Sequence, residues 1–223
     1  MTNPERPRFM INIIRLRVGM LSSNCYLVSD DNRGTLIIDP GDDADYIQRN
    51  ILNDDLKPTM IIATHGHFDH VLAVVELKLA YNIPFLMSED DEFLLSRMQS
   101  SVEHFTGAND VAPTPKIDDY LTRSNPVSVG KVKFDIIKTP GHTPGSVSLY
   151  CKGEGVLFTG DLIFAGGGVG RYDFDYCSKD DLIKSIKNVF KLPEDTIVYP
   201  GHGDITNIEK ERNILSSLIN GVV

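Results

Sequence analysis

The stretch that decides the fold reads Thr64-His65-Gly66-His67-Phe68-Asp69-His70. Residues 59–64, at its start, have the branched, uncharged composition of a buried strand, and residues 71–81, which follow it, have that of an apolar helix. Imidazole and carboxylate groups are common protein ligands of zinc and other transition metals. The stretch therefore predicts a metal site at the end of a strand.

Two neighbouring metal positions are expected. Alternate residues of an extended turn project to the same side, so His65 and His67 can bind one ion, while Asp69 and His70 at the helix entrance face an adjacent position. Further candidate ligands follow other predicted strands, at His142, Asp161 and His202. A single histidine in a Pro/Gly turn is usually structural, but the joint pattern favours metal binding. Because the set contains no cysteine and leaves positions open for water, it is typical of a catalytic site.

Short strands and helices alternate along the chain. Strands are expected at about 9–14, 25–29, 35–39, 59–64, 83–87, 132–138, 146–151, 155–159 and 196–199, and helices at about 43–52, 71–81, 179–190 and 208–219. No linker divides the 223 residues, so a single domain, 1–223, is expected. The pattern indicates an α/β domain in which sheets pack together with helices outside.

Composition narrows the class of protein. The chain has 22 Lys and Arg against 31 Asp and Glu, a formal net charge of −9, which disfavours nucleic acid as a partner. No signal-like segment and no long apolar run appears, so a cytoplasmic protein without a membrane partner is expected. Three cysteines without a Cys-x-x-Cys pair predict reduced, packed thiols rather than disulfides.

Several other features have simple explanations. Ser88 followed by the acidic run 89–92 is typical of a helix N-terminus rather than a cation site. The proline-containing segment 106–126 indicates a long surface loop, which we expect to border a substrate cleft. His104 is expected to be solvated on a helix, and Cys177 to be inert because no resolving cysteine lies nearby. The glycines near 166 lack the spacing of a nucleotide-binding loop.

The segments around His65, His142, Asp161 and His202, in this order, resemble the metallo-β-lactamase superfamily. That resemblance spans residues of about 11 to 215 and implies a four-layered αβ/βα sandwich, with two mixed sheets packed together and helices outside. The segments that resemble the small glyoxalase II-like branch are 24–28, 38–41, 160–165 leading to 170–173, and 199–203.

The resemblance assigns roles to the candidate residues. It implies that the first metal is held by His65, His67 and His142, the second by Asp69, His70 and His202, and that Asp161 bridges the two. Asp69 would also act in catalysis by orienting a metal-bridging hydroxide, the expected nucleophile. The expected cofactors are two divalent ions, with zinc preferred and iron or manganese as alternatives.

Three further residues have two possible readings. Asp39 can support a ligand imidazole or serve only its turn. Arg171 and Tyr172 can bind a substrate carboxylate or hydroxyl, although an arginine in a loop often holds the loop itself.

The resemblance implies a hydrolase of 2-hydroxyacyl thioesters, a small-molecule substrate class. Thiols have a pKa of about 8.5, so a thiolate leaves without the strong acid catalysis that an amide requires. The chain ends about 20 residues after His202, so no C-terminal glutathione-binding helical domain is expected, and glutathione dependence should be weak.

Other functions remain open at this point. Persulfide dioxygenases of the same superfamily resemble this branch and use one iron held by two histidines and one carboxylate. Hydrolysis of another ester or a lactone, or a non-catalytic metal-binding role, are further alternatives. β-Lactam hydrolysis is disfavoured because no export signal is seen. The sequence leaves the oligomeric state open.

Overall fold

The computed structural model describes residues 11–109, 111–122 and 127–217. The first sheet has the strand order β1-β2-β3-β4-β5-β6 and the second β14-β13-β10-β9-β8-β7. The first sheet contains β1 (Ile11–Val18), β2 (Ser23–Asp30), β3 (Gly34–Ile38), β4 (Lys57–Ile62), β5 (Phe85–Met87) and β6 (Asp119–Tyr120). The second contains β7 (Val127–Val129), β8 (Val132–Lys138), β9 (Val147–Cys151), β10 (Val156–Gly160), β13 (Ile197–Pro200) and β14 (Thr206–Asn207).

Both sheets are mixed. In the first, β1 to β3 are antiparallel and β3 to β6 are parallel, and in the second only the β10 and β13 pair is parallel. A small separate ribbon pairs β11 (Ile163–Phe164) with β12 (Gly168–Val169).

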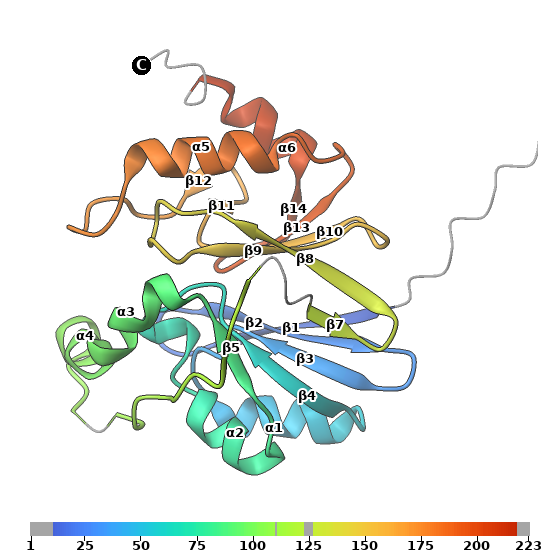
Figure 1. Ribbon diagram of the computed structural model, residues 1–223, viewed down its shortest axis with the longest axis vertical. Helices are drawn as coiled ribbons and strands as arrows, with labels where there is room; N and C mark the ends of the chain where they lie inside the picture. The colour runs from blue at the N-terminus through green and yellow to red at the C-terminus, as the bar shows by residue number, and fades with distance from the viewer. Residues whose placement is uncertain (1–10, 110, 123–126, 218–223) are drawn as a thin grey trace, which may run out of the picture.

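Helices cover the outer faces of the two sheets. They are α1 (Ala44–Asn53), α2 (Val74–Tyr81), α3 (Glu92–Ser96), α4 (Met98–Thr106), α5 (Lys179–Val189) and α6 (Ile208–Ile214), with short 3-10 turns at Phe68–His70 and Glu89–Asp91. Figure 1 shows α1 and α2 under the first sheet and α5 and α6 over the second. The predicted α/β fold, a four-layered sandwich of two mixed sheets with helices outside, is therefore confirmed.

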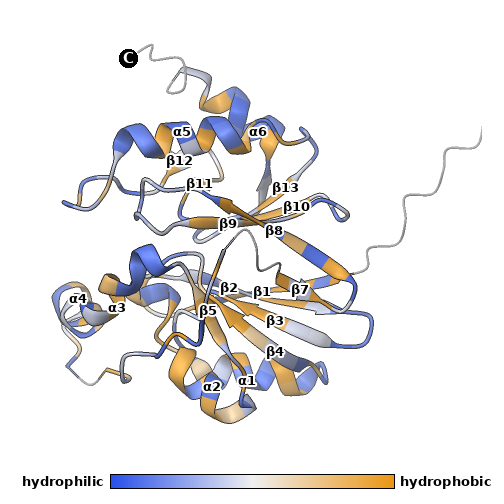
Figure 2. Cartoon of the chain, viewed as in Figure 1, coloured by the Kyte–Doolittle hydropathy of each residue, from blue (hydrophilic) through white to orange (hydrophobic). Residues whose placement is uncertain are grey.

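Three apolar clusters hold these layers together. One lies between the sheets and includes Tyr26, Phe134 and Phe158, with the ring centroids of Tyr26 and Phe158 5.2 Å apart. The other two join the first sheet to α1 and α2 and the second sheet to α5 and α6. Figure 2 shows the apolar colouring concentrated on these inner surfaces. Burying one such side chain contributes about 1.5–3 kcal/mol, so the sheet faces supply most of the driving force.

The long predicted strands and helices occur close to their expected positions. Among the described residues, the short strands β6, β7, β11, β12 and β14 were not anticipated, because two or three residues carry no periodic pattern. Ser88 does precede a helical segment, as predicted, and His104 does lie on a helix, α4. No helix in the described ranges is both long and apolar enough to cross a membrane.

The candidate ligands follow strands whose carboxyl ends meet at one edge of the molecule. β10 and β13 are parallel neighbours, so the turns that carry Asp161 and His202 lie side by side. The first sheet contributes the turn after β4, which bonds to the second sheet because the Val147 N–H donates to the Thr64 carbonyl at 2.9 Å. The fold thus assembles the site from both halves of the chain.

Candidate metal centre

All seven predicted ligands lie together at this edge. Their donor atoms form sets in which every atom lies within 4.8 Å of the others: His65, His67 and His142 in one set, Asp69, His70 and His202 in another. His65, His70 and Asp161 form a third, overlapping set. The sequence expectation of two adjacent positions therefore has a geometric counterpart.

The first set consists of three imidazoles. His67 Nδ1 lies 3.2 Å from His65 Nε2 and 2.9 Å from His142 Nε2. His65 and His142 are buried and His67 is half-buried. Three ring nitrogens that converge in this way present lone pairs to one point, which is the arrangement that a transition metal uses.

The second set combines a carboxylate with two imidazoles. Asp69 Oδ2 lies 3.2 Å from His202 Nε2 and 3.6 Å from His70 Nε2. Asp161 faces both sets, because its Oδ1 is 3.7 Å from His70 Nε2 and its Oδ2 is 3.5 Å from His142 Nε2 and 3.6 Å from His202 Nε2. This position between the two sets suits a carboxylate shared by two ions.

Buried polar atoms without hydrogen-bond partners indicate whether a metal ion fits at this site. Among the described side chains, His70 Nε2 and Asp161 Oδ1 are buried and have no hydrogen-bond partner. Leaving such a group unsatisfied costs about 1–3 kcal/mol, and more when it is charged. A divalent cation between these atoms would satisfy both, so the residues present fit a metal ion.

The ionisation of these groups reflects their crowding. Burial and the neighbouring His142 lower the pKa of His67 to about 3, and burial with the surrounding imidazoles also lowers the pKa of His65. Burial would lower the pKa of His70 too, but the nearby carboxylates, Asp69 first, raise it to about 10. Burial raises the pKa of Asp69, but His70, His202 and His67 together outweigh it and hold that pKa below its usual range.

Asp39 supports the ligand turn from beneath. It follows β3, is buried, and accepts hydrogen bonds from the Thr64 N–H at 2.6 Å and the Thr64 hydroxyl at 2.7 Å. Its Oδ2 lies 3.2 Å from His70 Nδ1, so His70 turns its Nε2 toward the other ligands. Two residues later, Gly41 lies so close to the Asp69 carbonyl that a Cβ would collide with it, so the turn after β3 packs directly against the ligand turn. Both contacts favour a supporting role for Asp39 over a purely local one.

The ring orientations of two other histidines are fixed by the segment that precedes α5. His142 Nδ1 lies 2.8 Å from the Arg171 carbonyl, which accepts its proton and leaves Nε2 free. His67 Nε2 lies 2.9 Å from the Tyr176 hydroxyl, which leaves Nδ1 to face His65. Cys177 is half-buried, burial raises the pKa of its thiol, and the thiol donates to the His142 carbonyl at 2.9 Å.

Asp91 is a supporting residue that the sequence did not reveal. Its carboxylate does not cap a helix. It accepts from the Gly66 N–H at 2.9 Å, the Gly145 N–H at 2.6 Å and the Thr143 hydroxyl at 2.7 Å. Burial raises the pKa of Asp91, while these hydrogen bonds oppose that rise. Asp91 thus ties the turn of His65 and His67 to the turn of His142.

Strand β2 ties the His202 turn to the first sheet. The Asn24 N–H donates to the Gly201 carbonyl at 2.7 Å, and the Tyr26 hydroxyl donates to the Pro200 carbonyl at 2.6 Å. The Ser23 hydroxyl donates to Asp69 Oδ2 at 3.0 Å. These contacts give a physical role to the 24–28 motif that the sequence singled out.

A cleft of about 530 Å³ opens above the ligands. Its walls are formed by Leu21, Gly66, His67, Phe68, Asp69, Leu94, Arg97, Ser101, Phe105, His142, Asp161, Phe164, Val169, Arg171, Phe174, Tyr176 and His202. Arg171 lines it, but its guanidinium is bound to both carboxylate oxygens of Asp173 at 2.9 Å. Tyr172 is not among the lining residues; it is 42% exposed, and the Lys179 ammonium lies over its ring. Tyr172, suggested from the sequence as a substrate contact, therefore does not line the cleft, whereas Tyr176 does and contacts His67.

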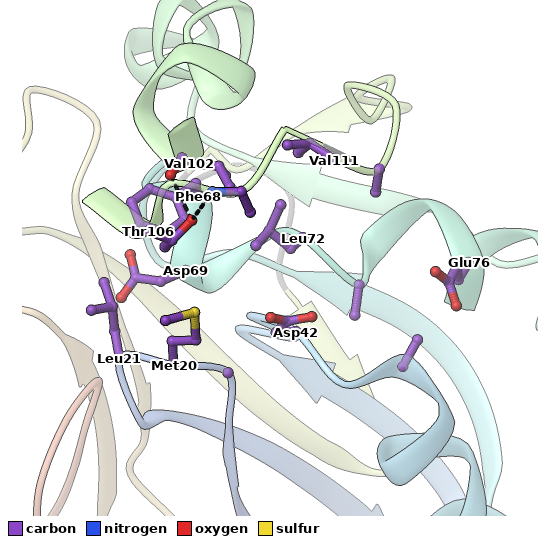
Figure 3. A pocket seen from close by; sticks show the side chains of 15 residues that line it. Met20, Leu21, Asp42, Phe68, Asp69, Leu72, Glu76, Val102, Thr106 and Val111 are labelled. Atoms are coloured by element: carbon purple, nitrogen blue, oxygen red, sulfur yellow. Dashed lines mark hydrogen bonds between the residues drawn. The ribbon is translucent and has the colours of Figure 1, made fainter. Parts of the chain in front are cut away.

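A second cavity, of about 250 Å³, lies on the other side of Asp69 and Phe68. Figure 3 shows Thr106 and Asp69 on one side of it and Glu76 on the opposite side, with Asp42 between them. Segment 106–126 contributes Thr106, Ala108, Val111 and Ala112 to this cavity and no residue to the metal cleft. The expectation that the loop borders the cleft is therefore wrong for its described residues; residues 110 and 123–126 lie outside them.

Known proteins are similar to this chain in sequence and in fold. Residues 18–202 match the sequence profile of the metallo-beta-lactamase superfamily. A Haemophilus influenzae protein named hydroxyacylglutathione hydrolase GloC is 34% identical over 205 residues, which cover 91% of this chain and 95% of that protein.

Two solved structures are similar in both fold and sequence. The BLEG-1 B3 metallo-beta-lactamase has a TM-score of 0.84 and 33% identity, with 91% of this chain and 97% of that chain covered. TTHA1623 in a di-iron-bound form has a TM-score of 0.80 and 32% identity, with 91% and 96% covered. Sequence profile, relative and structures agree, and the chain belongs to the metallo-beta-lactamase superfamily of metallo-hydrolases.

Proposed function

We propose that this protein is a two-metal hydrolase of 2-hydroxyacyl thioesters. The observation that carries the proposal is the position of Asp161 in an open cleft, where its Oδ2 lies 3.5 Å from His142 in one ligand set and 3.6 Å from His202 in the other. The name of the Haemophilus relative, a hydroxyacylglutathione hydrolase, supports the substrate class. Zinc is the proposed metal; the di-iron form of TTHA1623 keeps iron as an alternative.

The residues of the chain divide the work. Two bound divalent ions would lower the pKa of a water and polarise the carbonyl that it attacks. The ligands would be His65, His67 and His142 for one ion, Asp69, His70 and His202 for the other, with Asp161 shared. Asp69, which accepts a hydrogen bond from the Ser23 hydroxyl, would accept a second from the attacking water and so orient it.

The leaving group favours a thioester. In the reaction a C–O bond forms between water and the carbonyl carbon, the C–S bond breaks, and a carboxylate and a thiol are released with one proton. Every carboxylate and imidazole that lines the cleft belongs to the ligand sets, so none of them remains as a separate general acid, and the Tyr176 hydroxyl is bonded to His67. A thiolate leaves without one because its conjugate acid has a pKa of about 8.5, whereas an amine would need protonation.

A mononuclear iron oxygenase is the second candidate. The set of His65, His70 and Asp161 supplies two imidazoles and one carboxylate, the donor combination of non-haem iron enzymes that activate oxygen. Under that alternative the substrate would be a persulfide, as in the dioxygenases that this branch resembles.

One pair of assays separates the candidates. Protein loaded with zinc, and separately with iron, is given a lactoyl thioester while thiol release is followed, and a persulfide while oxygen uptake is followed. Thiol release without oxygen uptake supports the proposal. Oxygen uptake on the persulfide with no thioester turnover would contradict it and favour the oxygenase.

A further inference from the structure

One side of the metal cleft is built from stacked aromatic rings. Phe105 comes from α4, and Phe174 and Tyr176 come from the segment before α5; we call these three residues the aromatic wall. The rings of Phe174 and Tyr176 are stacked with centroids 5.3 Å apart, and Phe105 meets Phe174 edge-on at 6.4 Å. Phe93 backs Tyr176 at 5.5 Å, so the wall is supported from behind.

The wall begins at the metal ligands. The Phe174 ring centroid lies 5.9 Å from that of His67, and the Tyr176 hydroxyl bonds to the same imidazole. A substrate whose carbonyl lies at the ligand sets can therefore place a neighbouring substituent against these rings.

The outer part of the wall is open to water. Phe105 is 45% exposed although its ring stacks on Phe68 at 5.9 Å. Covering apolar surface is favourable, and a ring placed against a ring adds to that gain. An aromatic or bulky apolar group on the substrate would gain this energy, whereas the methyl group of a lactoyl unit is too small to reach it.

A cation lies at the rim of the same side. Arg97 lines the cleft, with its guanidinium 5.2 Å from the centre of the Phe93 ring, and it forms no ion pair with any residue that the structure describes. Arg171, in contrast, is occupied by Asp173. In a chain with a net charge of −9, Arg97 is the guanidinium that a bound anion can use.

We propose that the cleft selects thioesters that carry an aromatic or bulky apolar group beside the scissile carbonyl and a carboxylate farther out. The aromatic wall takes the apolar group and Arg97 takes the carboxylate. This inference rests on the proposed thioester hydrolysis and narrows it to one class of substrate.

The test compares four thioesters. Each carries either a lactoyl or a 2-hydroxy-2-phenylacetyl group, on either 3-mercaptopropionate or its methyl ester, and kcat/KM is measured for the metal-loaded protein. The phenyl substrate is expected to be preferred at least about tenfold, which corresponds to 1.4 kcal/mol, and the free carboxylate to lower KM. Phe105→Ala should reduce the phenyl preference to less than about threefold. Arg97→Gln should abolish the difference between the acid and its methyl ester.

Matched controls come from α1, away from the cleft. Tyr46→Ala removes an exposed aromatic ring and Arg49→Gln an exposed guanidinium, and both ratios should stay as in the unmodified protein. Equal turnover of lactoyl and phenyl substrates would overturn this inference while hydrolysis stands. So would a phenyl preference unchanged in Phe105→Ala or an acid preference unchanged in Arg97→Gln. Failure of all four substrates would instead overturn the proposed function, and this inference with it.

Discussion

Asp161 is the residue that lies close to members of both ligand sets. Its neighbours at 3.5–3.7 Å come from three different turns, so one carboxylate connects both proposed ions. Gly201 makes this possible, because a Cβ there would collide with Asp161 Oδ1. The sequence motif with a glycine just before His202 thus has a steric cause.

Replacing Asp161 should damage the site more than any other single ligand change. Asp161→Ala is expected to lower metal content below one ion per chain and thioester turnover by more than about a hundredfold, because both ions lose a ligand. Metal analysis and steady-state kinetics check this. Asp31→Ala, in an exposed turn, is the matched control. Unchanged metal content and turnover in Asp161→Ala would refute the shared role.

Tyr176 is expected to tune metal affinity through His67. Because His67 Nδ1 faces the other ligands, Nε2 carries the proton and donates it to the Tyr176 hydroxyl. Tyr176→Phe removes this acceptor and should weaken metal binding about tenfold. Competition with a chelator of known affinity measures the effect, with Tyr172→Phe as the control. Equal affinity in both variants would show that the contact has no influence on the metal.

The metal-free protein should lose stability in alkaline solution. His70 has a folded-state pKa of about 10, above the value of about 6.5 expected when unfolded. The pairing of protonated His70 with carboxylates therefore stabilises the metal-free folded protein. This contribution to the free energy of unfolding is complete below pH 6.5 and disappears as the pH rises toward 10. Melting temperatures from pH 6 to 10, with and without chelator, test this. A metal-free protein whose melting temperature stays level over that range would contradict it.

At the scale of elements, the site depends on loops that are tied to one another. Asp91 connects the turn after β4 to the turn after β8, and β2 connects the first sheet to the turn after β13. The grouping of the seven candidate ligands could be predicted, because their residue types and positions after strands carry a strong local signal. Asp91 could not, because it lies in an acidic run that reads as a helix start and its partners are 25 to 54 residues away.

Asp91→Ala should destabilise the protein and loosen the first ligand set. Three hydrogen bonds to a buried carboxylate are lost, and we expect a cost of about 3 kcal/mol. For a chain of this size that is a drop in Tm of about 6–12 °C. Calorimetry of the metal-loaded variant provides the measurement, with the exposed Asp90→Ala as its neighbour control. A Tm within about 2 °C of the unmodified protein would mean that the two turns are held together by other contacts.

At the scale of the whole molecule, the packing of the two sheets brings the turns that follow their strands together at one edge. The alternation of apolar strands and helices was enough to predict packed sheets with helices outside, because the burial of a sheet face produces a local periodic pattern of apolar residues. The cleft walls were not predictable, because Phe105 and Tyr176 are 71 residues apart and only packing brings them to the same side. Tyr172, suggested as a substrate contact, does not line the cleft, whereas Tyr176 does.

The central claim is that seven side chains from both halves of the chain hold two ions and hydrolyse a thioester. The most direct measurement is the metal content of active protein, determined by elemental analysis on samples whose thioester turnover is recorded in parallel. We predict about two transition-metal ions per chain, with turnover rising as the second ion binds. A single iron per chain, fully active in oxygen uptake and inactive on thioesters, would contradict the claim.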